Sequence, residues 1–281
     1  MSSRYARALT IAGSDSGGGA GIQADLKTFA ALGCYGSSAI TALTVQNTLR
    51  VSEIFAVPPH LVVAQVDAVL SDIGADAIKL GMLHSADTVA VVADALVRWA
   101  GRPVVLDPVM VATSGDALFE GAAVSALRQL LLPLATIVTP NLPEAAMLLA
   151  RPVVERGDME TAARDIVALG AGAVLLKGGH LPEGETIADV LVTRSPRGGL
   201  EATWFESPRI DTSNTHGTGC TLAAAIAAGL ARGAPLNRAV AEARDYLQGA
   251  LLAGASYRLG SGHGPVHHFY QLWNTPRREG G

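Results

Sequence analysis

Short apolar stretches alternate with longer amphipathic stretches over most of the chain. The short stretches are bounded by glycine, proline or polar residues and predict β-strands over 8–13, 36–45, 53–57, 77–82 and 103–108, with two more beginning at 135 and 173. The stretches between them have helical spacing and predict helices over 22–32, 61–70, 86–99, 117–131 and 161–169. This alternation predicts an α/β protein with a doubly wound, mostly parallel sheet.

The pattern changes in the last third of the chain. Segments 187–193 and 200–205 alternate between apolar and polar residues, which predicts an antiparallel pair that turns near Gly198. An alanine-rich segment over 223–230 and a long stretch over 236–254 predict two further helices. No repeat, low-complexity tract or linker interrupts the sequence. We therefore expect one domain over 1–281, with its core from about 8 to 270 and a polar tail.

Composition agrees with helices packed on a buried sheet. Of the 281 residues, 49% are hydrophobic, only 5% are aromatic and 16% are charged. Alanine, valine, leucine and glycine dominate, which suits a parallel sheet covered by helices better than a β-sandwich.

Charge and cysteine content narrow the class of partner and the compartment. The net charge is −4 and no basic tract occurs, so nothing points to nucleic acid or to an anionic membrane surface. Cys34 and Cys220 are far apart without C-x-x-C spacing, which favours a reducing compartment over disulfides or structural zinc. The apolar run over 8–12 is too short for a signal peptide, and no apolar stretch reaches about 18 residues. We expect a cytoplasmic protein.

One glycine-containing motif immediately precedes the alanine-rich helix. Gly217 and Gly219 let the backbone approach a ligand, and the first N–H groups of the helix are left free, so the motif predicts a phosphate site. Cys220 lies in the first turn, where the helix field is expected to lower its pKa and to make it a base or a nucleophile. The alternative is an ordinary tight turn followed by a buried cysteine.

Polar residues recur just past the predicted strand ends. Asp107, Asn141, Glu144 and Lys177 would gather with Cys220 at one edge of a parallel sheet, as a magnesium site, a phosphate-binding cation and an anion site. Asn141 and Glu144 alone favour a helix cap, and a lone lysine is more often a solvated side chain. The glycine loop over 13–21 lacks G-x-G-x-x-G spacing and no Walker motif occurs, so neither of those nucleotide sites is indicated.

Taken together, the motifs closely resemble those of the hydroxymethylpyrimidine/phosphomethylpyrimidine kinases of thiamine biosynthesis. The resemblance covers the chain from about residue 8 to 270 in the family's order. It rests on 12–25 (AGSDSGGGAGIQAD), 41–48 (TALTVQNT), 79–82 (KLGM), 107–115 (DPVMVATSG), 139–145 (TPNLPEA), 177–180 (KGGH) and 216–221 (HGTGCT). It implies a ribokinase-like three-layer α/β/α fold, ATP and Mg²⁺ as cofactors, and a homodimer.

The resemblance also implies a substrate pocket. Gln46 is expected to hydrogen-bond an aminopyrimidine ring, because a glutamine amide offers a donor and an acceptor side by side. The same pocket is expected to be lined by Gly13, Ala20, Asp25, Met82 and Val109.

On the nucleotide side, the resemblance implies a second set of residues. Lys177, Asn141 and Glu144 are expected to bind ATP, and Glu144, with Asp107 behind it, to hold Mg²⁺. The amides of the motif are expected to receive the transferring phosphoryl group, with Cys220 as the base, at the position where sugar kinases of this fold carry an aspartate. These amides belong to Gly217, Thr218, Gly219 and Cys220.

The resemblance implies stepwise phosphorylation of 4-amino-5-hydroxymethyl-2-methylpyrimidine and its monophosphate by ATP. A pyridoxal kinase or a dual-activity enzyme stays open, because Gln46 favours the pyrimidine without excluding a pyridine ring. A thiol hydrolase or acyltransferase with Cys220 as nucleophile, and His180 or His216 as partner, leaves the polar residues past the strand ends without a role. A nucleotide-binding regulator without catalysis is the remaining hypothesis.

Overall fold

A nine-stranded sheet forms the centre of the molecule. The computed structural model describes residues 4–110, 121–179, 181, 184–195 and 197–273. Within these ranges the strand order is β3-β2-β1-β4-β5-β6-β7-β8-β9. The strands are β1 (Ala6–Asp15), β2 (Cys34–Gln46), β3 (Val51–Ala56), β4 (Ala77–Leu80), β5 (Val104–Leu106), β6 (Ile137–Val138), β7 (Ala173–Leu176), β8 (Thr186–Arg194) and β9 (Leu200–Pro208).

The middle of the sheet is parallel and its borders are antiparallel. Strands β2, β1, β4, β5, β6 and β7 run parallel to one another. Strand β3 pairs antiparallel with β2, and β8 pairs antiparallel with both β7 and β9. The β8–β9 pair confirms the predicted hairpin over 187–205.

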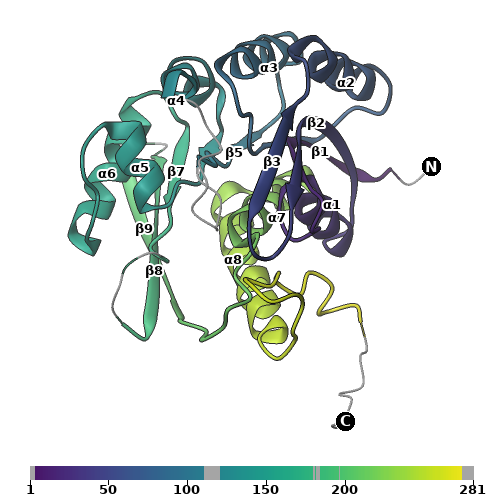
Figure 1. Ribbon diagram of the computed structural model, residues 1–281. Helices are drawn as coiled ribbons and strands as arrows, with labels where there is room; N and C mark the ends of the chain where they lie inside the picture. Colours follow the sequence, from purple (N-terminus) through teal and green to yellow (C-terminus); the bar gives the residue numbers. More distant parts are fainter. Residues whose placement is uncertain (1–3, 111–120, 180, 182–183, 196, 274–281) are drawn as a thin grey trace.

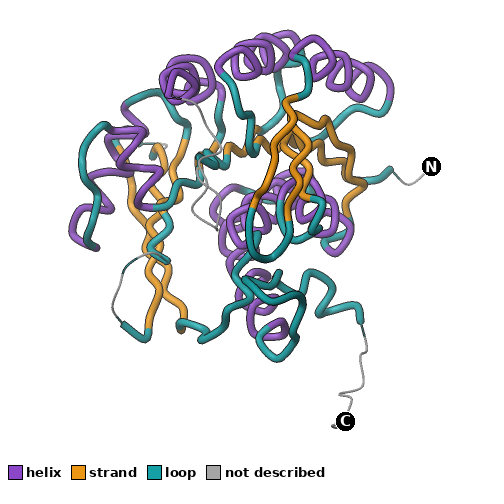
Figure 2. The backbone as a smooth tube through the Cα atoms, viewed as in Figure 1, coloured by secondary structure: helices purple, strands orange, loops and turns teal. Residues whose placement is uncertain are grey.

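Helices cover both faces of the sheet (Figures 1 and 2). One face carries α1 (Gly21–Ala31), α7 (Thr218–Ala231) and α8 (Leu236–Gly254). The other carries α2 (Pro59–Asp72), α3 (Ala86–Arg98), α4 (Gly121–Ala126), α5 (Leu142–Leu149) and α6 (Arg156–Ala168). The expected three-layer α/β/α fold is confirmed. None of the helices in the described ranges is long and apolar enough to cross a lipid bilayer.

Each face of the sheet has its own apolar core, because side chains alternate along a strand. On β4, Ile78 and Leu80 pack against the helices of the α2–α6 face, whereas Ala77 packs on the α1, α7 and α8 face. Helix α7 fits closely against the sheet because its buried face consists mainly of alanines.

Differences from the predicted elements lie mainly at their ends. Helix α6 begins five residues earlier than expected, at Arg156, because Glu155 and Asp158 form a capping box there. Ser85 caps α3, as predicted, through its side-chain oxygen and the Thr88 amide. The predicted helix over 117–131 falls partly outside the described residues, and its described part, α4, continues as a π-helical turn over Leu127–Leu131.

The strand order reverses beside β1. From β1 the chain forms β2 and β3 on one side and then crosses to β4 on the other side of β1. Connections that leave in opposite directions open a crevice at the carboxyl ends of the strands, which is where α/β proteins bind ligands.

Candidate active site

A cavity of about 630 Å³ lies at the carboxyl ends of the parallel strands. The ends of β1, β2, β4, β5 and β7, the starts of α5 and α7, and helix α8 form its walls. Its lining includes Gly13, Ala20, Gln46, Met82, Asp107, Val109, Asn141, Glu144, Lys177, Gly217, Thr218, Gly219 and Cys220. Of the residues that the sequence assigned to the site, only Asp25 does not line this cavity.

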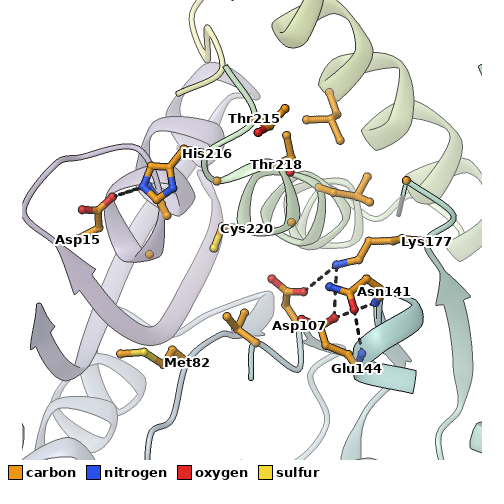
Figure 3. Close-up of a pocket in the computed structure, with 18 of the residues that line it drawn as sticks. Asp15, Met82, Asp107, Asn141, Glu144, Lys177, Thr215, His216, Thr218 and Cys220 are labelled. Atoms are coloured by element: carbon orange, nitrogen blue, oxygen red, sulfur yellow. Dashed lines mark hydrogen bonds and ion pairs between the residues drawn. The ribbon is translucent and has the colours of Figure 1, made fainter. Parts of the chain in front are cut away.

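The start of α7 forms an anion cradle, which we define as residues 217–220. Gly217 occupies the N-cap position with φ +80° and no side chain caps the helix. The amides of Gly219 and Cys220 belong to the first turn, where N–H groups have no partner within the helix. Figure 3 shows this turn between the Asp15–His216 pair and the group around Lys177. The cradle therefore presents free N–H groups and the positive end of the helix dipole to the cavity.

Gly217 is required for the close packing of two loops. A Cβ atom built on Gly217 would collide with the carbonyl oxygen of Gly19. The loop over 16–20 and the cradle thus touch through their backbones, and only glycine fits at this contact.

The thiol of Cys220 is protonated in the ligand-free structure, contrary to the expected lowering of its pKa. Burial raises the pKa of Cys220 to about 11, and the nearby Lys79 ammonium and Gly21 amide do not offset that effect. The sequence-based expectation was wrong because it considered the helix field without the loss of solvent around the sulfur. A base role for Cys220 requires the thiolate. In the ligand-free protein only a small fraction of the molecules carries this thiolate.

A second correction concerns Asp25. Its carboxylate is fully buried beneath the cavity, where Oδ2 lies 2.9 Å from Lys79 Nζ and accepts a hydrogen bond of 2.6 Å from Thr10 Oγ1. Lys79 lies on β4, where the alternation of side chains directs it to the face of the sheet that Asp25 occupies. Lys79 also lines the cavity. Burial alone lowers the pKa of Lys79, but the charge of Asp25 raises it above its ordinary value. Asp25 therefore holds the buried Lys79 ammonium in the wall of the cavity.

Asp107, Glu144 and Lys177 form a charged cluster on the opposite side of the cradle from His216 (Figure 3). Lys177 Nζ lies 3.3 Å from Asp107 Oδ1 and 3.9 Å from Glu144 Oε2. Burial alone lowers the pKa of Lys177, but the two carboxylates raise it above its ordinary value, so the ammonium is charged. Burial also raises the pKa of Glu144 to about 7.

Asn141 and Glu144 form a helix cap, as the two residues alone predicted. Glu144 N donates to Asn141 Oδ1 at 2.9 Å, and Asn141 N donates to Glu144 Oε2 at 2.8 Å. This reciprocal pair fixes the Glu144 carboxylate at the edge of the cavity.

The acidic cluster suits one Mg²⁺ ion that also contacts phosphate. Asp107 Oδ2 is buried and has no hydrogen-bond partner within the described part of the chain. In the same part of the chain, no group of three or more histidine, cysteine or acidic side chains gathers as a metal site. Mg²⁺ usually binds one or two carboxylates, waters and substrate phosphates, so two acidic residues beside an anion cradle fit this ion.

The structure adds cavity residues that the sequence did not assign. Asp15, Lys79 and His216 line the cavity as well. The lining also includes apolar side chains from β8 and α8, among them Ile187, Leu247 and Leu251. Asp15 and His216 lie within the quoted motifs, so their motif membership could have assigned them to the site. The single apolar residues on distant elements belong to no motif and could not have been found in this way.

The two histidines proposed for a thiol hydrolase do not support that reading. His180 lies outside the described residues. His216 Nε2 faces the carboxylate of Asp15 at 2.9 Å. That nitrogen therefore donates to Asp15, and within the described part of the chain no hydrogen bond joins His216 to the Cys220 sulfur.

Comparison with known proteins connects this geometry to one family. The phosphomethylpyrimidine kinase family model matches residues 15–267. The chain is 52% identical over 272 residues to the hydroxymethylpyrimidine/phosphomethylpyrimidine kinase of Rhizobium meliloti, covering 95% of this chain and 98% of that protein. The ADP complex of Bacillus subtilis pyridoxal kinase has a TM-score of 0.87 and 39% identity, covering 96% of this chain and 100% of the other. Phosphomethylpyrimidine kinase from Clostridium difficile has a TM-score of 0.75 and 38% identity, covering 87% and 99%.

Proposed function

The chain belongs to the phosphomethylpyrimidine kinase family, and we propose that it phosphorylates 4-amino-5-hydroxymethyl-2-methylpyrimidine and then its monophosphate, with ATP as donor. It is a phosphotransferase of thiamine biosynthesis with a ribokinase-like fold. The observation that carries the proposal is the meeting of Gln46, the anion cradle, Cys220 and Lys177 in one cavity.

The residues of the cavity divide the reaction between them. Gln46 binds the ring and directs the hydroxymethyl group to the cradle, where Cys220 removes the hydroxyl proton. The new bond joins the substrate oxygen to the γ-phosphorus of ATP, while the bond from that phosphorus to ADP breaks. Lys177 and the cradle amides stabilise the negative charge on the transferring group.

Asp107 and Glu144 would hold Mg²⁺ on the side of the cavity where Lys177 lies. The bound ion would neutralise phosphate charge and align the nucleotide. The Asp107 oxygen that has no hydrogen-bond partner among the described residues supports this assignment. The capped position of Glu144 supports it as well.

ADP release with Mg-ATP tests the function directly. The three acceptors are hydroxymethylpyrimidine, its monophosphate and pyridoxal, in separate reactions. We expect turnover with the first two and little with the third. Comparable turnover with pyridoxal would make the protein a dual-activity kinase. Pyridoxal is included because of the likeness to Bacillus subtilis pyridoxal kinase. Absence of turnover with any of the three would contradict the proposal.

Replacing Gln46 by leucine is expected to raise KM for hydroxymethylpyrimidine by about 100-fold, because a site built to hydrogen-bond a ring loses both partners at once. KM for ATP should change by less than about threefold, since Gln46 lies beside His216, on the side of the cradle opposite Lys177. Steady-state kinetics with each substrate varied in turn measure both values. Gln271→Leu, at an exposed glutamine outside the cavity, is the control. Equal losses for the two substrates would mean that Gln46 does not bind the ring.

We also propose a homodimer formed through the edge of the sheet beside β3. Leu43 and Phe55 are cross-strand partners on β2 and β3, and 48% and 63% of their surfaces are exposed. Val45 is 56% exposed on the same face, opposite the face that carries Gln46. An apolar edge of this kind is normally covered by another chain.

Phe55→Glu is expected to convert the dimer to a monomer, because it places a charge in the centre of this apolar face. Sedimentation velocity at micromolar concentration measures the change. Leu252→Glu on α8, where leucine is 67% exposed, provides a control outside the sheet edge and should leave the dimer intact. A wild-type protein that sediments as a monomer would contradict the proposed assembly.

We propose a cytoplasmic location, because cysteines stay free of disulfides in a reducing compartment. Both cysteines carry free thiols.

A further inference from the structure

The main chain around Lys177 is anchored by hydrogen bonds to two different segments. Lys177 N donates to the carbonyl oxygen of Pro140 at 2.9 Å, which joins it to the loop that leads into α5. Gly178 N donates to Asp189 Oδ1 on β8 at 2.8 Å, and this bond is buried. The main chain that carries the Lys177 ammonium is therefore held on one side by a backbone carbonyl and on the other by a carboxylate.

Gly178 also lies in direct contact with β8. A Cβ atom built on Gly178 would collide with the carbonyl oxygen of Ala188, the residue before Asp189. Close packing of this kind transmits small movements from one segment to the next. A shift of the Asp189 carboxylate would therefore move the main chain at Lys177 as well.

A guanidinium from α8 holds the Asp189 carboxylate. Arg244 Nε donates to Asp189 Oδ2 at 2.8 Å, and the two side chains are only 11% and 10% exposed. The guanidinium is fixed in turn, because its carbon lies 5.1 Å from the centre of the Phe205 ring and one terminal nitrogen lies 3.3 Å from Ser207 Oγ. One oxygen of Asp189 thus binds the Gly178 amide and the other binds a cation, so rotation of the carboxylate would break a charge-assisted hydrogen bond.

Asp189 lies on the same face of the sheet as Lys177. Side chains alternate along a strand, and Leu175 and Leu191, each two residues away, both pack in the core on the α1, α7 and α8 face. Asp189 and Lys177 also line the same cavity. The pair between β8 and α8 is therefore next to the strand end from which Lys177 reaches the two carboxylates of the charged cluster.

We propose that Asp189, held by Arg244, is a positioning residue that fixes Lys177 for contact with the phosphates of the bound nucleotide. The carboxylate fixes the main chain at Gly178, and that main chain determines the point from which the Lys177 ammonium reaches the transferring group. A displacement of about 1 Å in a site of this kind lowers the rate by up to about 10². This inference rests on the proposed role of Lys177 in phosphoryl transfer and adds the two side chains that hold the lysine in place.

A double-mutant cycle between Asp189 and Lys177 tests this role. Asp189→Ala removes the bonds to Gly178 and to the guanidinium. We expect kcat to fall about 20-fold in ADP-release assays, and Kd for a non-hydrolysable ATP analogue with Mg²⁺ to rise about fivefold in calorimetric titrations. KM for hydroxymethylpyrimidine should change by less than about twofold, because Gln46 lies on the side of the cradle opposite Lys177.

Two further variants show whether Asp189 acts through the lysine. In a Lys177→Met background, Asp189→Ala should change kcat and Kd by less than about twofold. Asp189→Asn, whose carboxamide oxygen still accepts from Gly178 N, should recover most of the wild-type kcat.

Three results would overturn the inference. An undiminished effect of Asp189→Ala in Lys177→Met would show that Asp189 acts without the lysine. A rise in KM for hydroxymethylpyrimidine equal to the rise in Kd for the analogue would show a general loss of the site. An Asp189→Asn variant as impaired as Asp189→Ala would show that the bond to Gly178 is unimportant.

Asp158→Ala is the control for a lost carboxylate. Asp158 also accepts hydrogen bonds from backbone N–H groups, at the start of α6, and it lies outside the cavity. The substitution should lower the midpoint of thermal unfolding, because a helix cap is lost, and leave kcat and Kd as in wild type.

Arg244→Met is a second variant, which carries the test should Asp189→Ala fail to fold. It keeps an unbranched apolar side chain beside Phe205 and removes the cation from Asp189. We expect kcat to fall about threefold, and this effect too should disappear in Lys177→Met. Unchanged kcat in folded Arg244→Met would overturn the inference.

The same experiment separates this inference from the proposed function. Wild-type protein that binds the ATP analogue but phosphorylates neither pyrimidine would contradict the proposed function. The cycle is then read in Kd alone, where additive effects of the two substitutions would overturn the positioning role and non-additive effects would support it. Wild-type protein that does not bind the analogue would contradict both.

Discussion

Cys220→Ala is expected to lower kcat for hydroxymethylpyrimidine by a factor of about 10² to 10⁴, the usual contribution of a positioned general base. The cradle amides are backbone groups and Lys177 comes from the loop after β7, so ATP binding should persist. Rapid-quench or coupled ADP-release kinetics measure kcat, and titration with a non-hydrolysable ATP analogue measures binding. Wild-type turnover in the alanine variant would exclude the base role.

The pH dependence of the wild-type enzyme distinguishes a base from a packing role. The pKa of Cys220 lies above the ordinary thiol value, at about 11, so the thiol is protonated at neutral pH. The thiolate fraction rises about tenfold per pH unit below that pKa, and kcat/KM should rise with pH for wild type and lose this slope in Cys220→Ala. Cys34→Ala, which removes the other thiol at a buried site outside the cavity, is the control and should keep the slope.

Gly217→Ala is expected to lower the free energy of unfolding by about 3 kcal/mol or more and kcat by about 10². Two effects add here. A φ of +80° is unfavourable for alanine, and the new Cβ collides with the Gly19 carbonyl, which moves the cradle away from the glycine loop. Urea unfolding measures the first change and ADP release the second.

Gly233 offers a matched control for this substitution. Its φ is +82°, close to that of Gly217, but no atom lies within 4 Å of a Cβ built there. Gly233→Ala should therefore cost only the backbone term of about 1–2 kcal/mol and leave kcat unchanged. Similar losses in the two variants would show that the contact with Gly19 is unimportant.

Local patterns predicted the elements well where each element is regular by itself. Helix α8 covers the predicted range 236–254, and the antiparallel pair over 187–205 is present. The start of α6 was missed because a glutamate cap is a weak signal next to a clear apolar repeat. Element ends depend on single hydrogen bonds, which periodicity does not report.

In the candidate site, too, some features follow from local sequence patterns and others depend on tertiary contacts. Asp107, Glu144 and Lys177 were expected to meet, and they do, because parallel strands bring their carboxyl ends to one edge. Asp25 was placed in the pocket by its motif, yet its helix turns it toward the buried ammonium of Lys79. The direction of a side chain and its exposure depend on neighbours from other elements.

The sequence by itself determined the strand and helix order, the family resemblance and many of the residues that gather at the cavity. These follow from periodicity and from motifs, which are properties of contiguous residues. Tertiary structure alone decided the raised pKa of Cys220, the pairing of Asp25 with Lys79 and the contact of Asp15 and His216 with Gln46. The physical reason is that desolvation and hydrogen bonding depend on which atoms surround a group, and here those atoms come from segments up to about 200 residues apart.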